Sequence, residues 1–237
     1  MPSPFLTAEW RWLAMLNYEI DPAVLAPFVP AGTELDAYDG TTYVSMVGFH
    51  FRYAKVRGFT FPFHEHFEEV NLRFYVRRSA GGETRRGVVF IKELVPRWAI
   101  AWTARRFYNE NYISLPMSHR IHKYGRERRT TYEWTFRGQA HFLEARSMSD
   151  PVLPPDDSLA AFITEHYWGY AKQRDGGTLE YQVEHPRWRV WTASEADFQC
   201  DVAALYGKEF APFLTETPVS AFIADGSPVS VYPGVRI

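Results

Sequence analysis

Apolar and polar residues alternate with a period of two along much of the chain, a pattern typical of β-strands that bury one face. The alternation predicts strands over residues 10–20, 43–51, 69–78, 87–94, 132–136, 141–145, 179–183 and 188–192. Gly81 and Gly82 predict a hairpin turn between the third and fourth of these strands. Asp225-Gly226 predicts a second hairpin, between strands over 219–224 and 229–232.

Helical spacing is confined to shorter segments between groups of strands. Helices are expected over residues 23–29, 98–108, 159–170 and 201–206. The first follows Asp21 and Pro22, because Asp accepts hydrogen bonds from first-turn amides and Pro has no amide hydrogen to leave unpaired. The third follows Ser158 and is ended by Gly176. Strands dominate, so we expect one α+β domain over residues 1–237, built mainly on an antiparallel sheet or barrel.

Composition excludes several classes of protein. The 237 residues are 46% hydrophobic and 23% charged, which supplies enough apolar surface to exclude intrinsic disorder. The formal net charge of −2 lacks the basic excess of nucleic-acid-binding proteins, so we expect no nucleic-acid partner. No window approaches the ~20 apolar residues of a membrane span, and residues 1–20 lack the pattern of a signal peptide. We therefore expect a soluble, cytoplasmic protein with no membrane partner.

The aromatic content is unusually high, at 17% of the residues. So many aromatic side chains favour a β-rich core or a deep apolar pocket, and composition does not choose between the two. The single cysteine, Cys200, excludes an intramolecular disulfide and a cysteine-based zinc site.

The strand expected over 69–78 has two chemically different faces. One face carries Val70, Leu72, Phe74 and Val76, and the other carries Glu69, Asn71, Arg73 and Tyr75. Because side chains alternate across a strand, the two sets point in opposite directions. The polar set is either the solvated side of a half-exposed sheet or the inner wall of a closed barrel, where it would face a ligand.

Several familiar catalytic motifs are missing, and the remaining candidates have ordinary structural explanations. The chain has no Gly-x-Ser-x-Gly elbow, P-loop or Gly-x-Gly-x-x-Gly motif. His64-Glu65-His66 could supply metal ligands, but we expect surface or packing histidines there, with no metal or cofactor. Glu165 and His166 lie on a helical stripe, where we expect a buried, hydrogen-bonded pair. Lys92 is either a buried amine nucleophile or a lysine paired with Glu93.

Four segments resemble recurrent motifs of a known family. They are Glu-His-Tyr-Trp-Gly-Tyr at 165–170, Glu-His-Pro-Arg-Trp at 184–188, Gly-Ser-Pro-Val at 226–229, and the stretch 67–77. The sequence resembles the YqjF-like proteins, a bacterial family of unknown function placed in the acetoacetate decarboxylase-like superfamily. The resemblance covers nearly the whole chain. It implies an α+β fold, a mainly antiparallel, cone-shaped β-barrel with flanking helices around a ligand cavity.

The resemblance also implies positions for active-site residues. Arg11 falls where the decarboxylases have an arginine ahead of an Asp-Pro helix start, and Glu69 takes the place of their active-site glutamate. Tyr112 and Ile113 occupy the positions of their catalytic lysine pair. A Schiff base needs a primary amine, so the usual decarboxylase route is not expected.

Three functions remain open from the sequence. The leading hypothesis is a barrel that binds a small organic anion such as a carboxylate or keto acid. In it Arg11 binds the carboxylate, Glu69 is the acid or base, and Tyr112 supplies a hydroxyl. The ligand-binding wall would further include Asn71, Arg73 and Tyr75.

The alternatives are of different classes. One is a lyase-type enzyme that uses Lys92 as its amine. Another is a non-catalytic interaction protein whose barrel is filled by aromatic side chains. Arg11 and Glu69 could also form a purely structural ion pair. No pattern in the chain predicts an oligomeric state.

Overall fold

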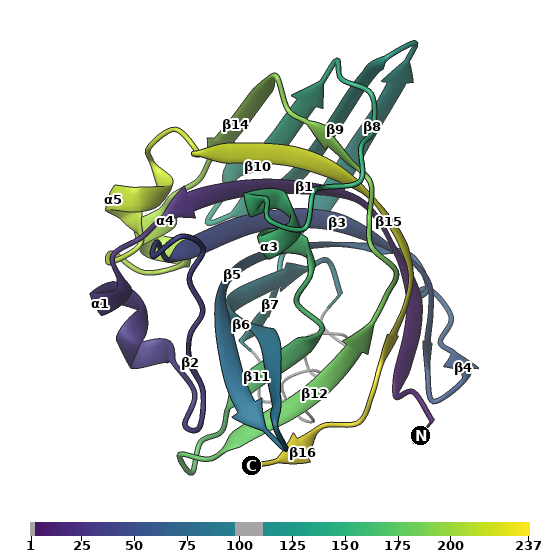
Figure 1. Ribbon diagram of the computed structural model, residues 1–237. Coiled ribbons are helices and arrows are strands. Elements are labelled where there is room, and N and C mark those ends of the chain that lie inside the picture. Colours follow the sequence, from purple (N-terminus) through teal and green to yellow (C-terminus); the bar gives the residue numbers. More distant parts are fainter. Residues whose placement is uncertain (1–2, 98–110) are drawn as a thin grey trace.

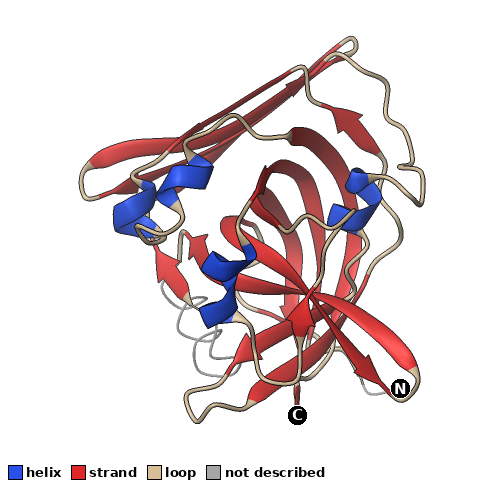
Figure 2. Cartoon of the chain, turned by 60° about the vertical axis from the view of Figure 1, so that its left-hand side comes forward, coloured by secondary structure: helices blue, strands red, loops and turns tan. Residues whose placement is uncertain are grey.

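The computed structural model describes residues 3–97 and 111–237, and strands make up most of them (Figure 1). The strands are β1 (Leu6–Glu19), β2 (Glu34–Leu35), β3 (Tyr43–Val56), β4 (Phe59–Thr60), β5 (Phe67–Ala80), β6 (Glu83–Val95), β7 (Tyr112–Ser114), β8 (Met117–Tyr124), β9 (Glu127–Phe136), β10 (Gln139–Ser147), β11 (Trp168–Lys172), β12 (Thr178–Glu184), β13 (Val190–Thr192), β14 (Glu195–Gln199), β15 (Ser220–Val231) and β16 (Val235–Arg236). The helical segments are α1 (Pro22–Leu25), η1 (Ala26–Phe28), α3 (Leu159–Thr164), α4 (Val202–Leu205) and α5 (Ala211–Leu214). Figure 2 shows these short helices beside the sheets.

The larger sheet closes on itself as a ring. Its strands follow the order β15-β1-β3-β5-β6-β11-β12, and β12 pairs back with β15 through Val183 opposite Val231. Most neighbours in the ring are antiparallel, and β6 with β11 is a parallel pair. A ring has an inner and an outer face, so period-two alternation divides each strand's side chains between an enclosed space and an outer surface.

A second sheet, in the order β14-β10-β9-β8, packs against the outer face of the ring over β15, β1 and β3 (Figure 1, top). Tyr132 of β9 reaches across and donates a hydrogen bond to the Trp12 carbonyl of β1, at 2.9 Å. Gly48 of β3 makes room for that ring, since a Cβ at this position would lie 2.5 Å from the Tyr132 side chain. The second sheet and the ring strands beneath it therefore pack closely face to face, as the two layers of a β-sandwich do.

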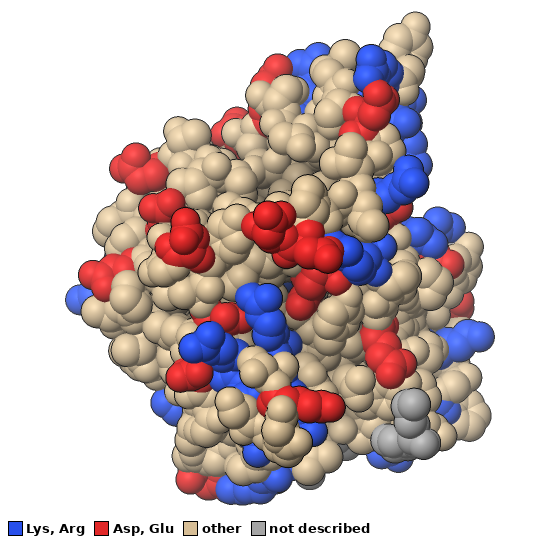
Figure 3. Space-filling view, viewed as in Figure 1, with Lys and Arg blue, Asp and Glu red and all other residues tan. Residues whose placement is uncertain are grey.

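The inner face of the ring carries a separate apolar cluster. Leu13, Met15, Val47 and Phe49 belong to it, and Phe162 of α3 packs against the same group. On the molecular face seen in Figure 3, acidic and basic side chains are interspersed. No helix in the described part of the chain is long and apolar enough to cross a membrane.

Most of the expected elements are confirmed. The strands over the first two-thirds of the chain exist and are longer than predicted, and Gly81 and Gly82 form the turn between β5 and β6, both with positive φ. Asp21 caps α1 by accepting a hydrogen bond from the Ala23 amide at 2.8 Å. The mostly-sheet fold is confirmed, and the helix expected over 98–108 lies outside the described residues. That the chain is one domain stays a prediction.

Two local predictions are wrong. The third predicted helix ends at Thr164, and Trp168 already starts β11, because Gly169 fits against the Tyr181 ring of β12 and the chain pairs as a strand there. The expected hairpin at Asp225-Gly226 does not form either, because β15 runs straight through it. Gly226 instead has a positive φ and pairs with Arg11, at the point where β1 shifts its register with β3, and β15 follows β1 there without a shift of its own.

Candidate functional site

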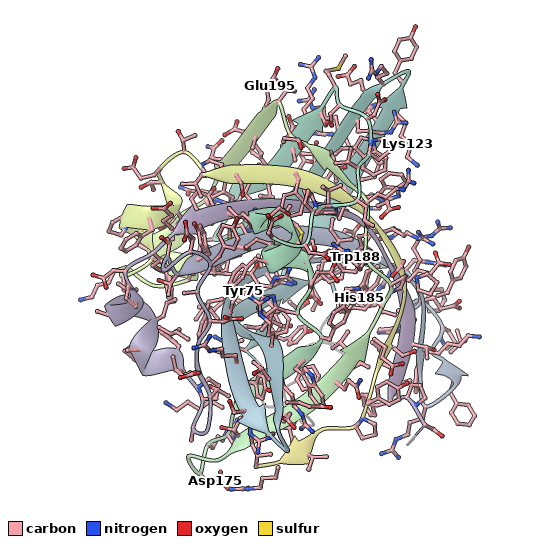
Figure 4. The ribbon with its side chains drawn as sticks, viewed as in Figure 1. Tyr75, Lys123, Asp175, His185, Trp188 and Glu195 are labelled. Atoms are coloured by element: carbon pink, nitrogen blue, oxygen red, sulfur yellow. The ribbon has the colours of Figure 1, made fainter. Side chains whose placement is uncertain are left out.

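The ring encloses a cavity of about 550 Å³. One end is lined by Ile163 of α3 and by His166, which follows α3, and the other reaches the surface at Phe61, which is 53% exposed. In Figure 4 the labelled Tyr75, His185 and Trp188 lie within the ring, while Lys123, Asp175 and Glu195 lie at the periphery. A cavity of this size falls in the range of small-molecule sites and is not a barrel packed solid with side chains.

The polar face predicted on β5 points into this cavity. Glu69, Asn71 and Arg73 all line it, which selects the inner-wall interpretation over the solvated one. Asn71 Nδ2 donates to Glu69 Oε1 at 2.9 Å, and the Tyr112 hydroxyl of β7 donates to Glu69 Oε2 at 3.2 Å. The structure therefore brings Glu69 and Tyr112 together, as the sequence hypothesis required. Glu93 of β6 also lines the cavity, and it is paired with Asn71 on the neighbouring strand β5.

Burial brings the pKa of the Glu69 carboxyl close to neutral pH. Its residue surface is only 3% exposed, and burial raises the pKa of its carboxyl to about 7. The hydrogen bonds from Asn71 and Tyr112 and the charge of Arg73 act in the opposite direction, but desolvation outweighs them. A carboxyl with this pKa is protonated in about half the molecules near neutral pH, which suits proton transfer.

Arg73 carries a buried charge with few partners. Its Nη2 donates to the Ile163 carbonyl, in the last turn of α3, at a long 3.4 Å. Its Nε is buried and has no hydrogen-bond partner among the described residues, and no described carboxylate forms an ion pair with it. Glu69, whose pKa the charge of Arg73 lowers, is ionised in only about half the molecules near neutral pH. A buried guanidinium with so little counter-charge is unfavourable, which marks this group as a candidate anion site.

His166 is the cavity residue whose role the sequence missed. Its Nε2 lies 3.2 Å from Asp36 Oδ2, and the same oxygen accepts a 2.6 Å bond from Arg86. Burial lowers the pKa of His166 to about 4, so the ring is neutral and Nε2 donates to the Asp36 carboxylate. Its Nδ1 is then a bare acceptor, with no partner among the described residues.

The predicted pairing of Glu165 with His166 is wrong. Glu165 accepts a hydrogen bond from the Tyr167 hydroxyl and lies near Arg187. Asp36, the true partner of His166, is 130 residues away in the sequence, and no local pattern points to it.

The structure corrects the expected position of Arg11. Its guanidinium lies outside the ring, where Nε donates to Glu9 at 3.0 Å and Nη1 donates to the Gly226 carbonyl at 3.1 Å. The cause is a β-bulge in β1, because Trp12 has a φ of 58° and the register with β3 shifts by one residue after Arg11. Leu13 faces the cavity, and without the bulge Arg11 would share that face. Arg11 and Glu69 therefore do not converge, either as a site or as an ion pair.

Lys92 is displaced in the same way. A register shift between β5 and β6 inserts one extra residue after Phe90, so Phe90 and Glu93 face the cavity while Lys92 points outward. Its Nζ donates to the carbonyl of Leu205, the last residue of α4, and burial lowers its pKa. The amine nucleophile therefore lies outside the cavity.

The other lysines also lie outside the cavity wall. All five lysines of the chain (Lys55, Lys92, Lys123, Lys172 and Lys208) belong to the described residues. None of them is among the side chains that line the cavity.

Two further expectations concern Tyr75 and the segment His64-Glu65-His66. Tyr75 is on the inner face but is not part of the cavity wall, because the rings of Phe162 and His166 cover it and its hydroxyl lies 2.6 Å from Ser45 Oγ. His64 lines the open end of the cavity. Among the described residues, no group of three or more His, Cys, Asp or Glu side chains is arranged to hold a metal ion.

Comparisons with known proteins agree on family and fold. A family model described as "Uncharacterized conserved protein", DUF2071, matches residues 7–228. The uncharacterized protein YqjF of Bacillus subtilis (strain 168) is 25% identical over 198 residues, which cover 81% of this chain and 76% of the relative.

Solved structures match over the full chain at low identity. An acetoacetate decarboxylase from Legionella pneumophila aligns with a TM-score of 0.68 and 12% identity, over 100% of this chain and 88% of that one. The enduracididine biosynthesis enzyme MppR, complexed with pyruvate, aligns with a TM-score of 0.68 and 14% identity, over 100% and 91% of the two chains. At such identities the likeness shows the fold alone.

Proposed function

The chain belongs to the DUF2071 family of uncharacterized conserved proteins, and from that premise we propose that it binds a small organic acid inside the ring of strands. The observation that carries the proposal is the buried guanidinium of Arg73, whose Nε lacks a partner among the described residues while the side chain lines a 550 Å³ cavity. A carboxylate fits this need, because it accepts two parallel N–H bonds from a guanidinium.

Each neighbouring group has a place in the proposal. The ligand carboxylate pairs with Arg73 and Asn71, and Glu69 with Tyr112 faces the adjacent carbonyl or hydroxyl of the ligand. The ring of strands acts as a cone-shaped, mainly antiparallel barrel around this cavity, in a cytoplasmic protein. MppR, whose fold is similar, forms a complex with pyruvate, a 2-oxo carboxylate, and this supports the same ligand class here.

The chemistry available to the bound acid is proton transfer. With no lysine among the lining residues, a Schiff base to the ligand has no amine to start from. Glu69, with its pKa of about 7, is the group that can take or give a proton near neutral pH. The size of the cavity weighs against a purely structural barrel filled by its own aromatic side chains.

Ligand binding is expected to raise the thermal stability of the protein. A 2-oxo acid should increase Tm progressively with its concentration, because a ligand that binds only the folded state shifts the unfolding equilibrium. The methyl ester of the same acid is the matched control, since it keeps the shape and lacks the charge. Differential scanning fluorimetry over a panel of 2-oxo acids and their esters measures both. Equal shifts for acid and ester, or none for either, would contradict the proposal.

Binding is also expected to weaken above pH 7. The ligand carboxyl, with an ordinary pKa near 3.5, stays ionised over pH 5–9. Burial raises the Glu69 pKa to about 7, so below that pH Glu69 is neutral and can donate to the ligand, and above it an ionised Glu69 repels the ligand. The affinity should fall by up to about tenfold per pH unit above 7.

Calorimetric titration between pH 5.5 and 8.5 tests this dependence, with Glu69→Gln as the control. The glutamine variant should bind with a much flatter pH profile over this range, because burial lowers the pKa values of His166 and His185, the two buried histidines of the cavity. The third cavity histidine, His64, lines the open end, away from Arg73. A wild-type profile that rises with pH would show that Glu69 does not face the ligand.

A further inference from the structure

The buried polar side chains of β5 lie toward one end of a long, mostly apolar cavity, while Arg57 and His64 line its open end. Six residues separate Phe67 from Arg73 along β5, which at ~3.3 Å per residue is about 20 Å. Glu69, Asn71 and Arg73 occupy the part nearer α3. At the level of Phe67 the wall is apolar, because Phe51 stacks on Phe67 with ring centroids 4.4 Å apart.

Large aromatic side chains continue this apolar part. Trp10 contacts the edges of Phe49 and Phe51, with centroids 5.4 and 6.0 Å away, and it lies 6.3 Å from Trp188. All of these side chains line the cavity. An acid as small as pyruvate would occupy the polar end and leave this aromatic section without contacts, although 550 Å³ is the size of a site for a much larger molecule.

The two ends of the cavity fix the direction of a ligand. The α3 end is closed by buried side chains, while the other end opens between Leu6, Val56 and the half-exposed Phe61. Arg73 lies at the closed end, so a carboxylate must enter first and the rest of the ligand must trail back toward the opening.

We propose that the ligand is an amphipathic carboxylic acid, with its carboxylate at Arg73 and an apolar tail lying between the aromatic side chains as far as Phe61. This rests on the proposed function, because it takes the carboxylate site at Arg73 as given. The tail is longer than the methyl group of pyruvate, and its burial supplies most of the affinity.

A series of 2-oxo acids tests the tail directly. The affinities of pyruvate, 2-oxohexanoate and 2-oxodecanoate for the wild-type protein should rise by about two- to fourfold per added methylene, the gain for moving a methylene out of water. Calorimetry at pH 6.5, below the critical micelle concentration of the longest acid, measures the three constants. Equal affinities for all three would overturn the proposed binding of an apolar tail and would still agree with a carboxylate site at Arg73. Failure of all three to bind would overturn the proposed function itself.

A matched pair of variants locates the tail. Val56 and Lys55 are neighbours on β3, but Val56 lines the opening of the cavity and Lys55 is exposed and is not part of the wall. Val56→Trp should weaken 2-oxodecanoate at least tenfold and leave pyruvate unchanged, and Lys55→Trp should change neither. Unchanged binding of 2-oxodecanoate to a folded Val56→Trp protein would overturn the placement. If that variant does not fold, the affinities of the three acids for the wild-type protein still test whether a tail is bound.

Discussion

Replacing Arg73 with methionine is expected to weaken the binding of a 2-oxo acid by at least about 30-fold, since truncating one partner of a buried, hydrogen-bonded charge pair costs 2–5 kcal/mol. Methionine keeps much of the side-chain volume and removes the guanidinium, so the loss reports the charge rather than a new cavity. Isothermal titration calorimetry at pH 6.5 measures the change in affinity.

The matched control is Arg11→Met. Arg11 is a half-buried guanidinium on the same ring of strands, but it bonds Glu9 and the Gly226 carbonyl outside the cavity. This variant should bind the acid as the wild type does. The opposite pattern, with Arg11→Met losing binding and Arg73→Met retaining it, would return the carboxylate site to the position that the superfamily resemblance implied.

Stability provides a second readout of the role of Arg73. A group kept for folding should lose stability when it is removed, but no described carboxylate pairs with this guanidinium. The ligand-free Arg73→Met protein should therefore be at least as stable as the wild type, because it no longer buries a charge that only the partly ionised Glu69 offsets. A fall in Tm of more than a few degrees would identify Arg73 as a structural residue.

The inner wall of the ring was predictable where the strand is regular. On β5 the alternation is unbroken from Phe67 to Val76, so the shared face of Glu69, Asn71 and Arg73 follows from the sequence alone. The contact between Glu69 and Tyr112 was also anticipated, through the positions that the superfamily resemblance implied. These residues form the core of the candidate site.

Two bulges account for the residues that were misplaced. A bulge adds one residue to a strand and reverses the face of everything on one side of it, and no pattern of hydrophobic residues marks where it occurs. The bulge at Trp12 turns Arg11 out of the ring, and the extra residue after Phe90 does the same to Lys92. Both candidates would have faced the cavity in regular strands.

The remaining omissions depend on contacts that are distant in the sequence. Asp36 and His166 meet because β2 pairs with β5 and α3 closes the end of the ring. Neither fact follows from a local pattern. The strand at 168–172 was missed for a related reason, since its apolar residues also fit a helical stripe and only pairing with β12 decides between the two.

Gly226→Ala is expected to destabilise the protein by roughly 2–5 kcal/mol, which combines about 1–2 kcal/mol for a left-handed backbone with about 1–3 kcal/mol for overpacking. Gly226 has a φ of +73°, and a Cβ there would lie 1.9 Å from the Trp10 carbonyl oxygen. A backbone oxygen cannot rotate away as a flexible side chain can, so β1 or β15 must move. Thermal unfolding should show a fall in Tm of about 4–20 °C, at 2–4 °C per kcal/mol for a chain of this size.

Gly58→Ala separates the two causes. Gly58 has nearly the same backbone conformation, with a φ of +80°, but nothing lies within 4 Å of its would-be Cβ. It should therefore lose only the roughly 1–2 kcal/mol of backbone strain. If both variants lose the same stability, the close approach of β15 to Trp10 is not what requires the glycine. If Gly226→Ala loses much more, the glycine that resembles a hairpin turn in the sequence is what lets β15 pack against the bulged strand, and that bulge turns Arg11 away from the cavity.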